Sequence, residues 1–473
     1  MTRIAPQPWM EEAPTRALLD ALGQAGIKAR FVGGCVRDAL LGQGPIADID
    51  LATPSRPEEV AAALDRAGIK VVPTGIAHGT VTAIVNSPGV DSPSPSPGPP
   101  RHFEITTLRR DVETDGRRAR VAFGADWAED AARRDFTLNA IYLDLDGTVY
   151  DPVGGLADLA ARRVRFVGDA VQRIAEDVLR VLRYYRFEAR FGTSNGRGPG
   201  SGGGDPAARA GCRASVKLLP KLSAERVAQE LLRLLAVPDP VPALQMMTED
   251  QVLAVILPEA TRPDRLARLI AIEAAPLPRR EPPLGRGSLA PPAGPDPSLP
   301  RLRGRLRVGE GEGRGGGSPD PLRRLAALIG VDAGGAAGLA ERLRLSNAER
   351  DRLVGLAPPW PLDPAGDDRV QHLALYRLGE DRFRDLVLLL AADGRVDAAR
   401  RKALLHLADS WRPPAFPLAG RDVTALGIPP GPRTGDLLGA VQRWWEAGDF
   451  TADRAACLEK LAEIAAGSPD RAR

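Results

Sequence analysis

Hydrophobic and polar positions divide the chain into a strand-rich first part and a helical remainder. Two segments, at about 14–25 and 57–67, show the periodicity of an amphipathic helix. They alternate with short apolar runs, each typical of a β-strand, at 29–33, 48–52, 69–72, 80–85, 102–106 and 139–145. The pattern predicts a head of roughly 150 residues that combines α-helices with a β-sheet.

From about residue 172 onward the strand pattern fades, and helical periodicity recurs toward the C-terminus, as in the segment IAEDVLRVLRYYRFEARF. This predicts an all-helical remainder and an α+β fold class for the whole chain. Three segments depart from the plan because they are rich in Pro, Gly, Ser or Arg: 87–100, 193–211 and 276–319. Such composition predicts flexible insertions. The first should be the loop of a long hairpin, and the third should split the helical region into two bodies.

Composition and charge exclude few classes of protein function. A chain of 473 residues exceeds one ordinary core and predicts several domains. Its 64 basic and 61 acidic residues nearly cancel, so the net charge of +3 gives no argument for nucleic-acid binding. Three cysteines without CxxC spacing favour a reducing compartment. Because no signal peptide and no membrane-spanning apolar stretch is evident, we expect a cytoplasmic protein with no membrane contact.

A strand that runs into two glycines and then a helix is the first candidate for chemistry. Residues 31–38 read FVGGCVRD, in which Gly33 and Gly34 form the turn and Arg37 and Asp38 follow in the predicted helix. Glycines let backbone N–H groups approach a phosphate, and a helix N-terminus favours an anion. Taken alone, such a turn is more often only a tight connection.

Two aspartates follow this turn on the next predicted strand. Asp48 and Asp50 flank Ile49, and because side chains alternate along a strand, both carboxylates should share one face. Mg²⁺ is commonly held by one or two carboxylates together with phosphates and waters. The pair therefore predicts a Mg²⁺ site for a two-metal-assisted in-line displacement at phosphorus. The alternative for an isolated pair is a polar strand end.

These features resemble the class II tRNA nucleotidyltransferase and bacterial poly(A) polymerase family, within the DNA polymerase β superfamily. The resemblance covers residues from about 28 to 236 almost continuously. It implies a nucleotidyltransferase head with a mixed β-sheet, in which Asp48 and Asp50 are catalytic and bind the metal ions. The other residues that match the family's metal-binding motif are implied to bind the nucleotide: Gly33, Gly34, Arg37 and Asp38.

The family's sugar-binding motif is matched by residues 133–140, which read RRDFTLNA. The resemblance implies that Arg134 and Asp135 contact the ribose and triphosphate, and it places Asn139 among the nucleotide-binding residues. A carboxylate that accepts a hydrogen bond from a 2′-hydroxyl favours ribonucleotides. Residues 106–117 resemble the family's flexible loop. Glu104, on the strand before this loop, is either a third acidic group near the metal ions or an exposed strand residue.

Base selection is the role that the resemblance implies for Asp177 and Arg180. These residues are three apart in a helical pattern, so their side chains should be neighbours on one helix face. A carboxylate accepts from an exocyclic amino group, and a guanidinium donates to a ring nitrogen or carbonyl. Cytosine and adenine offer an amino group beside an acceptor, whereas uracil and guanine present a carbonyl instead. The alternative for Asp177 and Arg180 is an ordinary ion pair on the helix surface. The resemblance also places Arg183 among the nucleotide-binding residues.

The resemblance also divides the chain into a head, a neck, a body and a tail. We expect the head at 1–158, the helical neck at 159–236, the helical body at 237–360 with a disordered insertion at 276–319, and a tRNA-binding helical tail at 361–473. Within the neck, Arg226 and Glu230 are spaced to act as a structural brace.

Together the motifs predict an enzyme that adds C, C and A in order to the 3′ end of tRNA from CTP and ATP. It should use Mg²⁺ and no nucleic-acid template. The segment PTGIAHGTVT at 73–82 favours a tRNA-end enzyme over a poly(A) polymerase, the nearest alternative. A non-catalytic RNA-binding protein is disfavoured because the acidic and base-reading residues are all present. The sequence does not specify the oligomeric state, or whether all three nucleotides are added.

Overall fold

The computed structural model describes residues 2–43, 46, 48–75, 79–87, 98–115, 118–192, 203–275 and 319–467. The chain forms two compact units. Unit 1 comprises Met1–Pro263 and Leu328–Pro358, and unit 2 comprises Asp264–Ala327 and Pro359–Arg473. Within the described residues, all strands belong to unit 1, whereas unit 2 is built from helices.

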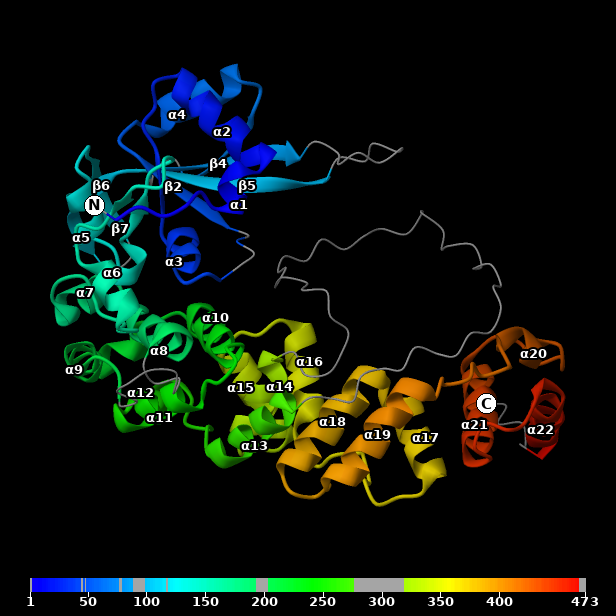
Figure 1. Cartoon of the computed structure of the whole chain (residues 1–473). Helices are drawn as coiled ribbons and strands as arrows, with labels where there is room; N and C mark the ends of the chain where they lie inside the picture. Colours follow the sequence, from blue (N-terminus) through cyan, green and yellow to red (C-terminus); the bar gives the residue numbers. More distant parts are fainter. Residues whose placement is uncertain are drawn as a thin grey trace. The chain divides into compact units, whose positions relative to one another are not determined.

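A seven-stranded mixed sheet forms the centre of the first part of unit 1 (Figure 1). Its strand order is β3-β4-β5-β2-β1-β8-β9, and all neighbours pair antiparallel except β2 and β5, which are parallel. Each apolar run that was predicted as a strand overlaps one, and the α+β prediction is confirmed. The bounds are β1 Arg30–Val32, β2 Ile49–Thr53, β3 Lys70–Gly75, β4 Thr80–Ser87, β5 Gly98–Thr107, β8 Tyr142–Leu143 and β9 Val149–Tyr150.

Helices cover the two faces of this sheet. α2 (Ala13–Gln24) and α4 (Pro57–Arg66) pack on β4 and on each other, and Figure 1 shows α3 (Gly34–Leu40) on the other side. α2 buries Leu18 and Leu22, which are four residues apart, and α4 buries Val60 and Leu64 with the same spacing. Burial of each such side chain stabilises the fold by about 1.5–3 kcal/mol.

The segment after β5 differs from the expectation of a flexible loop. β6 (Arg109–Asp115) and β7 (Arg118–Phe123) form an antiparallel two-stranded sheet with Asp111 opposite Val121. Pairing satisfies the backbone N–H and C=O groups on the facing edges of the two strands, which a loop would leave to solvent. Residues 116 and 117 of the expected loop, residues 76–78 of the segment 73–82, and residues 88–97 of the first insertion lie outside the described residues. The hairpin around that insertion is confirmed by the pairing of β4 with β5.

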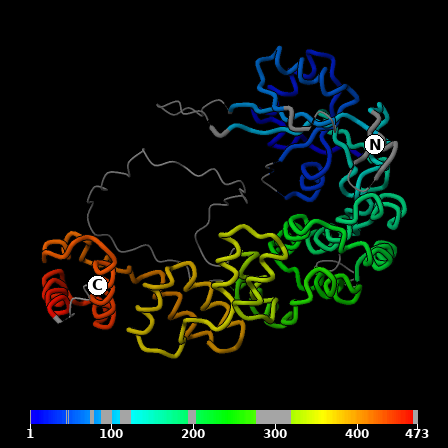
Figure 2. The backbone as a smooth tube through the Cα atoms, turned by 180° about the vertical axis from the view of Figure 1, so that it is seen from behind, coloured from blue at the N-terminus to red at the C-terminus, as the bar shows by residue number. Residues whose placement is uncertain are grey.

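An aromatic core joins the sheet to the helices that follow it in unit 1. The ring of Phe136 lies 4.9 Å from the rings of both Phe166 and Phe187, and Phe166 lies 5.9 Å from Tyr184. In Figure 2 these helices run from cyan to green, except for those at residues 333–356, which are yellow. The helical bounds of unit 1 not yet given are α1 Pro8–Glu11, α5 Trp127–Ala132, η2 Thr137–Asn139, α6 Gly155–Ala160, α7 Ala170–Glu176, α8 Arg180–Phe191, α9 Pro206–Ala214, η4 Val216–Lys221, α10 Ala224–Leu235, α11 Val241–Glu249, α12 Val252–Ile256, α15 Ala333–Arg342 and α16 Asn347–Leu356.

Unit 2 is held together in part by a buried ion cluster. Glu273 accepts hydrogen bonds from Arg323 at 2.9 Å and Arg324 at 2.8 Å, and Arg323 also donates to Asp385 at 2.8 Å. The cluster joins α13, α14 and α18. The remaining helices include α20–α22, whose core contains Val441 and Trp445. The bounds are α13 Pro263–Ala274, α14 Pro321–Leu328, α17 Asp368–Leu378, α18 Glu380–Ala392, α19 Ala398–Ser410, α20 Gly420–Thr424, α21 Pro432–Ala447 and α22 Arg454–Gly467.

The third insertion does not separate two bodies, in contrast to the expectation. Residues 276–318 lie outside the described residues, but the helices before and after them, α13 and α14, are joined by the Glu273 cluster within unit 2. Contacts between distant segments decide this, and composition does not report them. The proposed boundaries at 158, 236 and 360 stay predictions.

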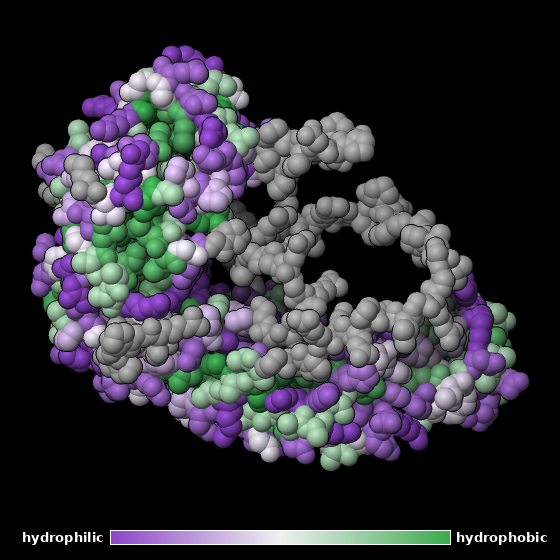
Figure 3. Space-filling view, in the orientation of Figure 1, coloured by the Kyte–Doolittle hydropathy of each residue, from purple (hydrophilic) through white to green (hydrophobic). Residues whose placement is uncertain are grey.

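Hydrophilic side chains cover much of the described surface in the view of Figure 3, with apolar residues scattered among them. In the described part of the chain, no helix combines the length and the apolar character that crossing a membrane requires.

Candidate active site

The two acidic residues lie where β2 begins. Ile49 and Leu51 of this strand are 1% and 0% exposed and face the core. Asp48 is exposed and Asp50 is half-buried, so both carboxylates avoid the core. Residues 48–51 thus alternate as the sequence predicted, whereas Ala52 and Thr53, which complete the strand, are both buried.

Glu104 lies beside this pair because β5 runs parallel to β2 and places Glu104 opposite Asp50. Burial raises the pKa of Asp50 to about 6; the charges of Glu104 and Asp48 contribute to the rise, and Arg134 opposes it. Negative charges therefore crowd this part of the sheet. Glu104 is an exposed strand residue and also a neighbour of the acidic pair. An exposed position and a place near the metal ions, which the sequence offered as alternatives, are therefore compatible. We call Asp48, Asp50 and Glu104 the acidic face.

The acidic face suits a divalent cation that binds together with a phosphate ligand. Among the described residues, no three His, Cys, Asp or Glu side chains form a complete metal site by themselves. Hard cations such as Mg²⁺, however, ordinarily take one or two carboxylates and complete their shell with waters and substrate phosphates. A cation would also offset the repulsion that, after burial, contributes to the raised pKa of Asp50. The donor set therefore fits such an ion.

Gly33 brings the turn between β1 and α3 against the acidic face. Its φ of +79° lies in the left-handed region that favours glycine. A Cβ at this position would lie 3.4 Å from Asp50 Oδ2, in van der Waals contact, so the turn lies directly against the carboxylate. Gly34 follows as the first residue of α3. The turn is thus adjacent to the acidic pair, and phosphate binding by Gly33 and Gly34 stays a prediction.

Arg37 and Asp38 on α3 are engaged with protein partners. Arg37 is 6% exposed; its Nε donates to Asp38 at 2.8 Å, and its Nη1 donates to Asn139 Oδ1 at 2.7 Å. Its guanidinium also lies 4.1 Å from the centre of the Phe191 ring. Burial lowers the pKa of Arg37, and the charge of Asp38 opposes this. Arg37 therefore points into the protein, whereas it was expected to contact the nucleotide.

Arg134 is fixed close to the acidic face by a buried carboxylate. Its Nε and Nη2 donate to Asp130 Oδ2 at 3.1 and 3.0 Å. Asp130 is 1% exposed and also accepts from Arg133 at 2.9 Å and from the hydroxyl of Tyr142 at 2.7 Å. Burial opposes its ionisation, but the two arginines hold its pKa below the ordinary value. The sequence analysis missed Asp130, although its spacing of three and four residues from two arginines was the available signal.

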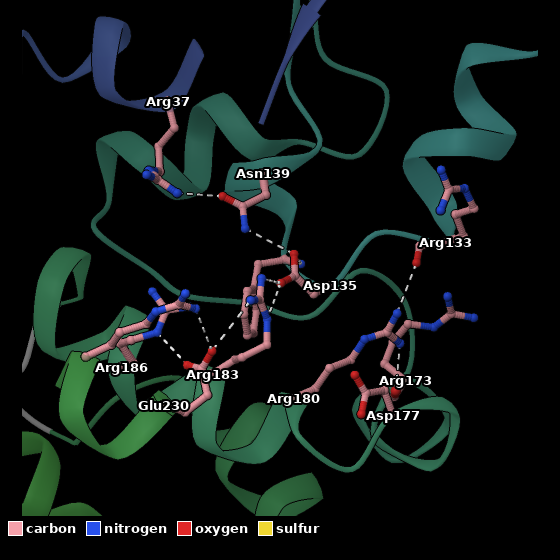
Figure 4. A network of polar contacts seen from close by, with 12 residues as sticks. Arg37, Arg133, Asp135, Asn139, Arg173, Asp177, Arg180, Arg183, Arg186 and Glu230 are labelled. Carbon is pink, nitrogen blue, oxygen red and sulfur yellow. Dashed lines mark hydrogen bonds and ion pairs between the residues drawn. The ribbon is translucent and has the colours of Figure 1, made fainter. Parts of the chain in front are cut away.

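Asp135 lies in a network of hydrogen bonds and ion pairs that Figure 4 shows. Its Oδ1 accepts from the backbone N–H of Phe136 at 2.8 Å and from Asn139 Nδ2 at 3.0 Å. Its Oδ2 accepts from Arg183 Nε at 3.0 Å and also from Arg183 Nη2. Burial opposes ionisation of Asp135, but Arg183 and these hydrogen bonds hold its pKa below the ordinary value. The structure therefore brings Arg37, Asn139, Asp135 and Arg183 together.

Asp177 and Arg180 do not share a helix, so the expected spacing on one face is wrong. α7 ends at Glu176, Asp177 has extended backbone with φ −150° and ψ 104°, and α8 begins at Arg180. Asp177 Oδ2 accepts from Arg226 at 2.7 Å, and Oδ1 accepts from the backbone N–H of Leu179 at 3.1 Å. The helix-surface rule of three residues fails because the chain leaves the helix between the two positions.

Arg180 connects α7 to the segment that carries the sugar-binding motif. Its Nη1 donates to Glu176 Oε2 at 2.6 Å and to the carbonyl of Arg173 at 2.7 Å. Its Nη2 donates to the carbonyl of Arg133 at 3.3 Å (Figure 4). These contacts use three of the five N–H donors of a guanidinium. Arg180 is thus held in place by α7 and by the residue that precedes Arg134.

The brace expected from α10 is present. Arg226 donates to Asp177, and Glu230, which is 3% exposed, accepts from Arg186 Nε at 2.6 Å. Arg183 Nη1 lies 3.9 Å from the other carboxylate oxygen of Glu230. α10 therefore supports both the Asp177 carboxylate and the Arg183 side of Asp135.

Comparisons with known proteins agree with this geometry. The model of the poly A polymerase head domain matches residues 29–165, and that of a probable RNA and SrmB-binding site of polymerase A matches residues 205–262. The mitochondrial CCA tRNA nucleotidyltransferase 1 of Danio rerio is 30% identical over 441 residues, which are 92% of this chain and 87% of the relative. The chain belongs to the class II CCA-adding and poly(A) polymerase family of nucleotidyltransferases.

Two further similarities support the assignment to this nucleotidyltransferase family. The CCA-adding enzyme of Leuconostoc citreum is 39% identical over 232 residues, about half of each chain. The crystal structure of the Bacillus stearothermophilus CCA-adding enzyme in complex with CTP superposes with a TM-score of 0.68 at 26% identity and covers 98% of both chains. The head model includes the acidic face and the Asp135 motif. The protein is therefore an enzyme, and the acidic face of a nucleotidyltransferase of this family suits a divalent metal ion.

Proposed function

We propose that this enzyme adds C, C and A in order to the 3′ end of tRNA from CTP and ATP, without a nucleic-acid template. The observation that carries the proposal is the acidic face beside the Gly33 turn, in a chain that belongs to the CCA-adding family. In each step the 3′-hydroxyl of the tRNA attacks the α-phosphorus of the nucleotide, a new phosphodiester bond forms, and pyrophosphate leaves.

Asp48 and Asp50 are the residues that hold Mg²⁺ in this proposal. Bound Mg²⁺ would lower the pKa of the attacking hydroxyl and offset the charge of the leaving pyrophosphate. Glu104 adds a third carboxylate next to Asp50 and increases the negative charge that attracts the cation. Gly33 supplies the left-handed turn beside Asp50, and the neighbouring Gly34 lets the backbone approach the triphosphate. Arg134, which is near enough to Asp50 to influence its pKa, supplies positive charge for the phosphates.

Asp135 selects the sugar in the same proposal. The carboxylate accepts four hydrogen bonds, two on each oxygen, so in this proposal the 2′-hydroxyl donates to Oδ2 in place of one of the two Arg183 bonds. A deoxyribonucleotide has no hydroxyl to donate. Arg183 and Asn139 hold the carboxylate ionised and in one orientation, so only one hydrogen bond has to be exchanged when the nucleotide binds.

Base selection rests on Asp177 and Arg180, as proposed from the sequence, but through different geometry. Arg226 and the N–H of Leu179 orient the Asp177 carboxylate, which keeps lone pairs for the amino group of cytosine or adenine. Within the described part of the chain, two N–H groups of Arg180 remain for the acceptor on the base. The two groups are thus positioned separately, by α10 and by α7, and do not neutralise each other.

Residues 361–473 are our proposed tRNA-binding tail, which would set the distance between the tRNA body and its 3′ end. We place the enzyme in the cytoplasm because its three cysteines, Cys35, Cys212 and Cys457, are free and buried thiols, as expected in a reducing compartment.

The decisive assay uses purified protein, tRNA that ends before its CCA, Mg²⁺, and CTP and ATP separately and together. We expect a product three nucleotides longer, with C, C and A in that order, and little product from unstructured RNA. UTP and GTP should be poor substrates. A long ladder of A residues on any RNA, without use of CTP, would identify a poly(A) polymerase instead.

A further inference from the structure

Asn139 lies between a side chain that can only donate hydrogen bonds and one that can only accept them. Its Oδ1 accepts from Arg37 Nη1 at 2.7 Å, and its Nδ2 donates to Asp135 Oδ1 at 3.0 Å (Figure 4). Asn139 is 8% exposed. If the amide turned over, its NH₂ group would face a guanidinium and its oxygen would face a carboxylate. The amide therefore has a single allowed orientation, and Arg37 sets it.

Arg37 is itself held in place by α3 and α8. Asp38 accepts from its Nε at 2.8 Å, and the ring of Phe191 lies 4.1 Å from its guanidinium carbon. Because the side chain is 6% exposed and packed on these partners, it has little freedom to move. The position of α3, directly after the Gly33 turn, thus determines where the donor for Asn139 lies.

The carboxylate of Asp135 is in turn held on both oxygens. Asn139 and the backbone N–H of Phe136 bind Oδ1, and Arg183 binds Oδ2. Loss of the Asn139 bond would leave Oδ1 with the backbone N–H of Phe136 and Oδ2 with Arg183, so the carboxylate would be less restrained against rotation about its χ angles. Such rotation would move the acceptor that we assign to the 2′-hydroxyl, while the backbone and the acidic face would stay in place.

We propose that Arg37 is a positioning residue for sugar selection, acting through Asn139 on the Asp135 carboxylate, and that it does not contact the nucleotide. This inference rests on the proposed function, in which Asp135 binds the ribose. It reassigns a residue of the metal-binding motif to the discrimination between ribonucleotides and deoxyribonucleotides. A phosphate ligand would aid both sugars equally, whereas a positioning residue for Asp135 would aid only the nucleotide that has a 2′-hydroxyl.

The test compares kcat/KM for CTP and dCTP in the first addition to tRNA that lacks its end. In Arg37→Gln and Asn139→Ala we expect the CTP/dCTP ratio to fall about tenfold, with the loss on CTP. Arg37→Lys, which keeps a cationic donor, should recover part of the ratio. Because the two residues act in series, the Arg37→Gln/Asn139→Ala double variant should lose no more than the larger single loss.

Arg190→Gln is the matched control. Like Arg37, Arg190 contacts Asp38, at 3.5 Å, and lies over the ring of Phe191, at 5.0 Å, but it does not bond to Asn139. Its CTP/dCTP ratio should equal that of the unaltered enzyme. If Arg37→Gln shows no cooperative thermal transition and is therefore unfolded, the CTP/dCTP ratios of Asn139→Ala and Arg37→Lys test the inference.

Equal losses with CTP and dCTP in the Arg37 and Asn139 variants would overturn the inference and indicate a phosphate contact or a general structural role. Additive losses in the double variant would overturn the serial arrangement. Failure of the proposed function looks different: the unaltered enzyme would transfer neither CTP nor ATP to tRNA lacking its end, or would use CTP and dCTP equally.

Discussion

Two groups of carboxylates in unit 1 differ in how their charges are balanced. In the acidic face, Asp50 lies among other carboxylates, and burial together with these charges raises its pKa to about 6. Around Asp135 and Glu230, arginines surround the carboxylates, and despite burial the pKa of Asp135 is lowered. In our proposal the difference separates two roles: carboxylates that arginines neutralise bind and orient neighbouring groups, and carboxylates left among like charges attract a cation from outside the chain.

Neutralising a carboxylate of the acidic face should have the largest effect, and that effect is on catalysis. Asp50→Asn or Asp48→Asn should lower nucleotide transfer by about 10³-fold or more, because a metal ligand is lost. The thermal transition of the metal-free protein should be unchanged or higher, since one of several repelling charges is removed. Single-turnover transfer of CTP, measured across Mg²⁺ concentrations, checks this. Near-normal Mg²⁺-dependent activity in either variant would remove the metal assignment.

The next largest effect is expected on base selection. Asp177→Ala should raise misincorporation of U and G relative to C and A by about 10- to 100-fold, because the acceptor for the amino group is lost. Arg226→Gln should shift the ratio in the same direction but less, because it orients the Asp177 carboxylate. Competition assays with all four nucleotides measure the ratio. A uniform loss for the four would instead mark Asp177 and its partner as structural.

The two groups of carboxylates should also differ in how much each contributes to stability, which changes at Glu230 and Glu104 can compare. Glu230→Gln should reduce the free energy of unfolding by about 3 kcal/mol, since it leaves Arg186 partly buried without its charged partner. Glu104→Gln is the matched change in the acidic face and should cost nothing or stabilise the metal-free protein slightly. Urea denaturation in EDTA gives both values. Equal losses in the two variants would show that the charge balance of the regions does not differ.

The smallest effects are opposite dependences of stability on pH in metal-free buffer. The pKa of Asp50 is raised from 3.8 to about 6, so the folded protein holds this proton longer, and the contribution of Asp50 to stability falls as the pH rises from about 4 to 6. The pKa of Asp135 is lowered, so its contribution is present above 3.8 and is lost as the pH falls below that value. Asp50→Asn and Asp135→Asn should each remove one of these dependences. Unfolding measured from pH 3 to 7 would reject the contrast if both slopes had the same sign.

Much of the fold followed from local pattern. The apolar runs predicted the strands because a half-buried strand has a two-residue period, and the helical segments were evident from their own period. The pattern could not anticipate β6 and β7, whose charged residues do not alternate with apolar ones consistently. It also could not show that α13 and α14 join across the insertion, since the Glu273 cluster links residues about 50 positions apart in the chain.

By itself, the sequence determined which residues are candidates for the chemistry of the site: Asp48 and Asp50 at the start of β2, the Gly33 turn, and the residues that match the sugar and base motifs. These rest on short-range spacing and on residue type, which the sequence states directly. Only the tertiary structure decided which partner each charged group has. It paired Asp177 with Arg226 instead of Arg180, turned Arg37 inward to Asn139, and set Glu104 beside Asp50. The physical reason is that ion pairs and strand register join groups far apart in the chain, and their distances depend on how whole helices and strands pack.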